Sequence, residues 1–366
     1  MEEQKESSGA DTAAEVYSAP PSQISQEEIA GLRIPFGKRL LRAVALLILC
    51  VAIPFAVGLL FGHRDAAIAC VYGTIIVIGS ASFNGLRATR YAAPAAIVAI
   101  VLGAITKPVA DHPGDTPFNG WLWVAVVVFF AMLSGFATRR GAGVAMSMAT
   151  LFAVVAPAFR DYSELAEVLI FLAIGSVYGW LIASRIGAPT ASPAPPTSPR
   201  SARLIAIFLG IAVGLGCSVV VVSNLPHATW IATAVVVLGI PTPGFTEKAI
   251  LWRMVGQLLA CGIVAVVTWI ITSAGFANPL PYFGIAVGLS LLCYLMSLGS
   301  NVAVQIAFLS TTLMLPVAAK ESSEIGGVVI DRIAYNLIGL GILALALVAV
   351  RIWAREIATS TLPPAT

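Results

Sequence analysis

Long apolar runs recur through most of this 366-residue chain, and they constrain its fold more than any other feature. About 20 apolar residues in a helix cross the roughly 30 Å hydrocarbon core of a bilayer, since a helix rises about 1.5 Å per residue. Charged residues make up only 11% of the chain and its mean hydropathy is +0.93, which does not fit a soluble domain with a solvated surface. The sequence therefore predicts an all-α, polytopic integral membrane protein in contact with the lipid bilayer. The net charge of +3 is too small to indicate a nucleic-acid partner.

Twelve such runs can be counted, six in each half of the chain. They lie near residues 39–61, 65–83, 91–109, 119–138, 141–158 and 165–185, and near residues 203–222, 227–241, 249–274, 278–298, 301–318 and 325–353. The run at 227–241 is short for a span and could be a re-entrant segment, although its counterpart in the first half favours a crossing. We therefore expect about 12 transmembrane helices.

A linker rich in Pro, Ala and Ser at residues 186–202 divides the chain into two halves. The halves resemble each other weakly, and Arg90 and Arg253 occupy corresponding places at the start of the third run in each. Six crossings are an even number, so both halves enter the membrane from the same side. This predicts two parallel-oriented six-helix repeats, residues 39–185 and residues 203–353.

The positions of the basic residues predict the topology, because Lys and Arg that flank membrane spans are retained on the cytoplasmic side. With the N-terminus inside, most basic flanking residues are cytoplasmic. The exceptions are Arg64, Lys107, Arg160, Lys320 and Arg332. We therefore expect a multi-pass protein of the cytoplasmic (inner) membrane with both termini in the cytoplasm. Residues 1–38 are expected to form a disordered acidic tail, and residues 354–366 a C-terminal tail.

The chain carries no signature of catalysis, metal binding or cofactor binding. It lacks the phosphate-binding motif Gly-x-x-x-x-Gly-Lys and the hydrolase motif Gly-x-Ser-x-Gly. Its five cysteines fall inside apolar runs without the short paired spacings of a metal or redox site. The histidines, His63, His112 and His227, sit beside external loops and are divided between the two halves. We therefore expect no enzyme activity, no metal and no cofactor.

A helix break marks the second half. Pro241 and Pro243 remove backbone donors and Gly244 tolerates a reversal, so the segment Pro-Thr-Pro-Gly should end one helix before another begins. If the next helix starts near Gly244, Arg253 lies about 13 Å along it. A guanidinium at that depth should face protein, water or an anionic ligand, because its charge is costly in lipid. The alternative is that Arg253 snorkels to the cytoplasmic headgroups, with Lys248 on another side of the same helix.

The last apolar run carries two polar pairs at four-residue spacing, which are Asp331 with Tyr335 and Arg332 with Asn336. If this helix begins near Ser323, Asp331 lies about 12 Å along it, a depth that suits a proton-coupling carboxylate. The alternative is that Asp331 and Arg332 mark the external interface. An acidic residue also opens the last run of the first half.

These motifs resemble the fusaric acid resistance (FUSC) family. The resemblance rests on the His227-Ala-Thr-Trp230 helix start, the Pro-x-Pro-Gly break, a following basic residue and Gly256 one turn after Arg253. The final run through Tyr335 and Asn336 to Arg351 is also similar to the helix that closes each half in that family. The family includes aromatic acid exporters, and plant aluminium-activated malate transporters resemble it more distantly.

Two departures from the family pattern stand beside the resemblance. The linker at residues 186–202 is too short to hold the soluble domain of many members. Phe83-Asn84-Gly85 replaces the proline-containing break in the first half, which argues against equal contributions of the halves to a site.

The resemblance implies proton-coupled export of small organic or aromatic acids or related toxic compounds. The residues expected to bind this small anionic or aromatic solute are Arg253, Arg90, Lys248, Tyr335 and Asn336, and those expected to carry the proton are Asp331 and Glu167. A passive anion channel and a non-transporting membrane scaffold or assembly subunit are the alternatives. A homo-oligomer or an accessory protein would fit any of the three.

Overall fold

The computed structural model describes residues 49, 53, 69–74, 76–77, 86–106, 118–156, 162–187, 197–223, 225, 228–241, 247–274 and 325–360. Its long elements are α6 (Leu86–Ile105), α7 (Phe118–Ala137), α8 (Gly143–Val155), α9 (Tyr162–Ile182), α10 (Pro199–Val222), α11 (Thr229–Gly239), α12 (Glu247–Ser273) and α15 (Ile325–Ser360). Within these ranges the chain forms helix and no strand, which confirms the all-α prediction.

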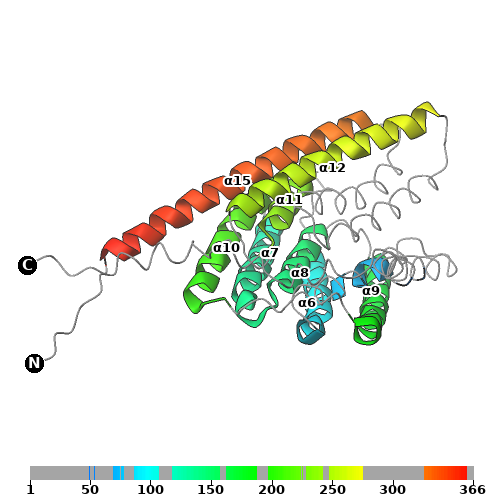
Figure 1. Ribbon diagram of the computed structural model, residues 1–366, viewed down its shortest axis with the longest axis horizontal. Coiled ribbons are helices and arrows are strands. Elements are labelled where there is room, and N and C mark those ends of the chain that lie inside the picture. Colours follow the sequence, from blue (N-terminus) through cyan, green and yellow to red (C-terminus); the bar gives the residue numbers. More distant parts are fainter. Residues whose placement is uncertain are drawn as a thin grey trace, which may run out of the picture.

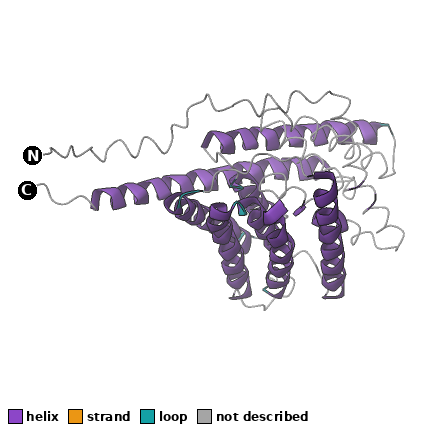
Figure 2. Cartoon of the chain, turned by 60° about the horizontal axis from the view of Figure 1, so that its bottom comes forward, coloured by secondary structure: helices purple, strands orange, loops and turns teal. Residues whose placement is uncertain are grey.

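The helices run in two main directions. Figure 1 shows α12 and α15 side by side along the long axis of the molecule, with α11 beneath them. Helices α6 to α10 lie across this pair, and the second view in Figure 2 shows the same crossing. Helix α11 packs against α8, α10, α12 and α15, so this short helix sits where the two sets of helices meet.

Five of the described helices are long and apolar enough to cross a membrane. Their apolar windows are Gly120–Arg140, Leu165–Arg185, Pro199–Val222, Ile250–Ile271 and Asp331–Trp353. Large apolar side chains point outward from them, among them Phe129, Val177, Trp269 and Leu345, each more than half exposed. Outward apolar side chains fit lipid as the surrounding solvent, so the protein is a multi-pass membrane protein. The count of 12 spans and the two repeats stay predictions, because several expected spans lie outside the described residues.

Helix α11 is too short to cross a bilayer by itself. Its 11 residues, Thr229–Gly239, are about 16 Å long, roughly half the hydrocarbon thickness of a bilayer. The helix alone does not reach both faces of a membrane. The re-entrant alternative for the run at 227–241 therefore fits its length.

Two helix ends differ from the boundaries expected from sequence. Helix α10 begins at Pro199, inside the expected linker, because Ser198 caps it by accepting a hydrogen bond from the Ser201 backbone N–H at 3.2 Å. Proline is favoured in the first turn, where its missing N–H has no partner to lose. Helix α15 continues to Ser360, so the C-terminal tail expected from residue 354 begins as helix.

Glycines let the helices approach closely, as Gly175 and Gly135 illustrate. A Cβ at Gly175 in α9 would overlap the Cys70 carbonyl, and the Thr74 hydroxyl donates to the Gly175 carbonyl at 3.1 Å. A Cβ at Gly135 in α7 would overlap the backbone of Ala206 in α10. The second contact joins the two predicted halves, because α7 precedes the linker and α10 follows it.

Both predicted halves contribute to the larger hydrophobic core. Trp123 of α7 is fully buried, and its indole N–H donates to the Ala153 carbonyl of α8 at 3.0 Å. The same core continues through Leu209 of α10 and Leu343 of α15. Helix α6 packs on α9, and helix α12 packs on α15.

We expect Gly135→Ala to weaken the contact between the halves. The added Cβ would overlap Ala206, so α7 and α10 would have to move apart and lose dispersion contacts. Gly341→Ala is the matched control, because a Cβ there meets nothing within 4 Å. Thermal unfolding in detergent should give a lower midpoint for Gly135→Ala and no loss for the control. Equal midpoints would contradict the close α7–α10 contact.

Candidate functional site: a buried polar seam between α12 and α15

Buried polar side chains separate into two groups. Six of them are Ser or Thr hydroxyls that donate to a carbonyl three or four residues earlier in their own helix, namely Thr74, Thr106, Ser134, Ser147, Thr150 and Ser176. These hydroxyls are satisfied locally. The remaining buried polar residues of the described chain are Arg253, Gln257 and Asn336, and all three lie on α12 and α15. Among these nine residues, the side chains that are not satisfied within their own helix therefore lie on α12 and α15.

Arg253 closes the end of α11. This helix ends at Gly239, and Pro241 follows, so the last carbonyls of the helix have no partner from a continuing helix. The Arg253 Nη1 donates to the Leu238 carbonyl at 2.9 Å and to the Ile240 carbonyl at 2.6 Å. The positive guanidinium also complements the partial negative charge at a helix C-terminus. A residue of α12 thus completes the hydrogen bonding of α11.

The position of Arg253 differs from the snorkelling alternative. Helix α12 begins at Glu247, which puts Arg253 about 9 Å along it. Its side chain is only 3% exposed and is directed to the carbonyls of the helix break. Binding of an anion by Arg253 stays a prediction. Lys248 lies in the first turn of α12, whereas Pro243 and Gly244 lie outside the described residues.

A polar stripe continues from Arg253 along α12. Gln257 and Cys261 follow it at intervals of four residues, which places all three on one face of the helix. The Asn336 Nδ2 of α15 lies 3.8 Å from the Cys261 Sγ as a weak donor. We call Arg253, Gln257, Cys261, Arg332 and Asn336 the polar seam.

Three atoms of the seam are buried without a hydrogen-bond partner. They are the Gln257 Oε1, the Asn336 Oδ1 and the Arg332 Nε. A buried polar group without a partner costs about 1–3 kcal/mol, so such groups are usually paired or functional. Gln257 and Asn336 are 3% and 1% exposed, which leaves bulk water no access to their amides. The seam therefore has hydrogen-bonding capacity that the packed protein does not use.

Aromatic side chains of α11 and α15 adjoin the seam. The guanidinium carbon of Arg332 lies 4.9 Å from the centroid of the Trp230 ring, within range of a cation–π interaction. The Tyr335 ring lies against Trp230 at 6.4 Å between centroids, with an interplanar angle of 79°. Trp230 and Gln257 are absent from the site predicted from sequence. The four-residue spacing from Arg253 through Gln257 to Cys261 is the signal that could have found Gln257.

The structure brings some of the predicted site residues together and leaves others apart. Tyr335 and Asn336 are buried at the seam, and Asp331 is half-buried immediately before Arg332 on α15. Arg90 is exposed on α6 with its guanidinium carbon 4.9 Å from the Tyr91 ring centroid, and Glu167 is half-buried on α9. Both residues lie in the predicted first half, on helices α6 and α9, which pack against each other. The three histidines lie outside the described residues.

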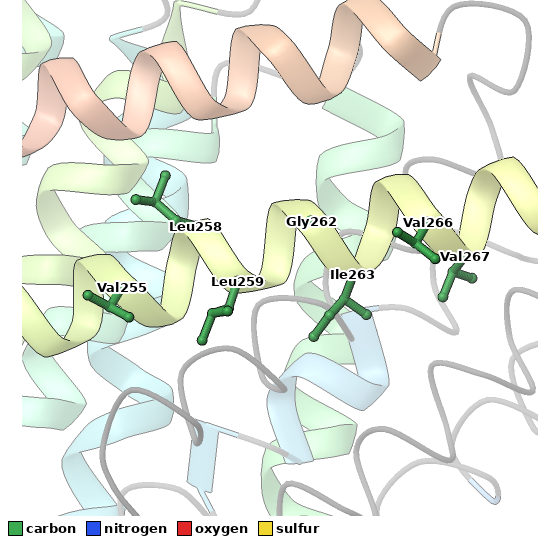
Figure 3. Close-up of a pocket in the computed structure, with 7 residues that line it drawn as sticks. All are labelled: Val255, Leu258, Leu259, Gly262, Ile263, Val266 and Val267. Atoms are coloured by element: carbon green, nitrogen blue, oxygen red, sulfur yellow. The ribbon is translucent and has the colours of Figure 1, made fainter.

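Another face of α12 is apolar. A groove of about 560 Å³ runs along it, and Figure 3 shows the side chains that line this groove. The lining residues carry no polar side chain, and they are Val255, Leu258, Leu259, Gly262, Ile263, Val266 and Val267. Helix α12 therefore has a polar face, which carries the stripe through Gln257, and an apolar face, which lines the groove.

The comparisons with known proteins agree with the sequence motifs. Residues 215–346 match the family of fusaric acid resistance protein-like proteins. This match supports the FUSC family assignment, and it covers α11, α12 and the part of α15 that carries the seam. No curated protein matches the chain, and no solved structure matches it.

We expect Arg253→Leu to destabilise the fold. The substitution removes the Arg253 donor from the Leu238 and Ile240 carbonyls, and a buried group left unsatisfied costs about 1–3 kcal/mol. Arg253→Lys should lose less stability than Arg253→Leu, because an ammonium keeps the positive charge. Some loss should remain, because the planar fork of the guanidinium is gone. Arg140→Leu, at an exposed arginine after α7, is the control. Thermal unfolding midpoints in detergent check this, and a midpoint for Arg253→Leu as high as that of the control would remove the role of Arg253 as a helix cap.

Proposed function

We propose that this chain, with its FUSC family match in the second half, is a transporter of the cytoplasmic membrane that exports small organic or aromatic acids by coupling to the proton gradient. Both termini are proposed to lie in the cytoplasm, as the distribution of basic residues predicts. The family match and the multi-pass helical architecture support a transporter rather than an enzyme. The proposed acidic solute and the proposed coupling to protons rest on the seam and on the residues beside it.

The observation that carries the proposal is the unused hydrogen-bonding capacity of the seam. Polar groups in membrane helices are expensive, and those that face the protein interior commonly mark a path for a solute or proton. The unpaired atoms of Gln257, Asn336 and Arg332 lie within the family-matched segment. A solute or its water would satisfy them when the seam opens.

The charges of the seam favour an anion. Arg253 of α12 and Arg332 of α15 contribute two guanidiniums to the seam, and a carboxylate accepts paired hydrogen bonds from such a group. Tyr335 and Asn336 are proposed to line the same path. Lys248, at the start of α12, and Arg90, at the start of α6, are proposed to attract the anion before it enters.

Asp331 is the proposed proton carrier. It is half-buried and next to Arg332 in sequence, so its charge state changes the electrostatic potential that an anion meets in the seam. Glu167 of α9 is proposed as the counterpart in the first half. A carboxyl that binds a proton on one side of the membrane and releases it on the other would link solute movement to the gradient.

Transport in proteoliposomes tests this function. The full-length chain should move radiolabelled benzoate faster under an imposed pH gradient than without one. Asp331→Asn should remove mainly this stimulation, because an amide cannot release a proton, whereas Arg253→Gln should slow transport at every pH. Glu167→Gln tests the proposed counterpart, and Arg140→Gln is the exposed control.

The outcomes separate the alternatives. A passive anion channel would be indicated if the rate of solute movement did not depend on the pH gradient and the protein gave a conductance in a planar bilayer. Absence of any movement, together with loss of cellular activity on deletion of the acidic N-terminal tail, would indicate a scaffold. Either result would contradict proton-coupled export.

A further inference from the structure

The two guanidiniums of the seam differ in what they can offer a solute. The Nη1 of Arg253 already donates to the Leu238 and Ile240 carbonyls. The Nε of Arg332 is buried and has no hydrogen-bond partner, while the residue as a whole is half-buried. Arg253 is therefore used by the fold, whereas Arg332 retains an unused donor.

Arg332 is held against an aromatic ring. Its guanidinium carbon lies over the Trp230 ring at 4.9 Å from the centroid, and the edge-to-face contact with Tyr335 fixes the Trp230 ring in turn. A cation–π contact does not require all the N–H groups of a guanidinium, and the Arg332 Nε has no hydrogen-bond partner. The edge of a guanidinium presents two parallel N–H groups, which match the two oxygens of a carboxylate.

Two side-chain amides of the seam provide hydrogen-bond acceptors in addition to the Arg332 guanidinium. Asn336 lies one turn after Arg332 on the same face of α15, and its Oδ1 has no partner. The Gln257 Oε1 is unpaired on the facing helix α12. These acceptors cannot bind a carboxylate, but they can accept a hydrogen bond from a solute-borne hydroxyl or from accompanying water.

We propose that Arg332, held over Trp230, is the residue that binds the carboxylate of the solute. This inference rests on the proposed function. It assigns recognition to the α11–α15 contact and leaves Arg253 as the positioning residue that holds the end of α11. The geometry of the fork, and not positive charge alone, provides the recognition.

The test uses the full-length chain in proteoliposomes with benzoate and succinate as probes. Arg332→Lys should raise the KM for benzoate about tenfold with little change in kcat, because the charge remains and the fork is lost. Trp230→Leu should raise the KM in the same direction, since the fork is no longer held. Trp252→Leu, at an exposed tryptophan of α12, is the matched control and should leave the KM unchanged.

A merely structural role would give a different pattern. Lower thermal stability and lower kcat with an unchanged KM in Arg332→Lys would overturn the inference and leave the proposed function standing. A raised KM in Arg253→Lys but not in Arg332→Lys would move recognition to the helix break and also overturn it. If the wild-type chain moves neither benzoate nor succinate, the proposed function fails and the inference fails with it.

Discussion

The carbonyl groups at the end of α11 are the constraint on which the second half of this structure depends. In a membrane interior no water is present to accept or donate hydrogen bonds, so a helix that stops there must find a protein donor. Arg253 supplies that donor from α12, and its charge is stabilised by the same carbonyls. One contact thereby satisfies the helix break, buries a charge that lipid would not accept, and fixes α12 against α11.

The helix break after α11 also contacts the first half of the chain. Pro241, which follows α11, is buried against Gly143 at the start of α8, where a Cβ would meet the proline ring at 3.3 Å. Helix α11 is thus in contact with α8 of the first half and with α10, α12 and α15 of the second. A change at the seam can reach both halves through this short helix, which is the physical basis for treating it as the centre of the site.

The sequence predicted the features that depend on local pattern and missed those that depend on tertiary contact. Apolar runs placed α7, α9, α10 and α12 within a few residues, because length and hydropathy act along the chain. The depth of Arg253 predicted that it would face protein, water or a ligand, but its partners are carbonyls at the end of α11, a tertiary contact that no local pattern specifies. Trp230 and Arg332 are about 100 positions apart in sequence, so only the fold could reveal their cation–π contact. Arg90 is exposed, whereas Arg253, at the corresponding place in the sequence of the second half, is buried.

The central claim is that the polar seam opens to solute during transport, and Cys261 reports on it directly. Its thiol is fully buried against Asn336, and Cys217 of α10 is equally buried in the hydrophobic core outside the seam. Labelling by a small water-soluble thiol reagent can be measured in two variants that each retain one of these cysteines as the only thiol. The account predicts that Cys261 becomes reactive during benzoate transport while Cys217 stays protected. Transport with both thiols unreactive, or with both equally reactive, would contradict a solute path through the seam.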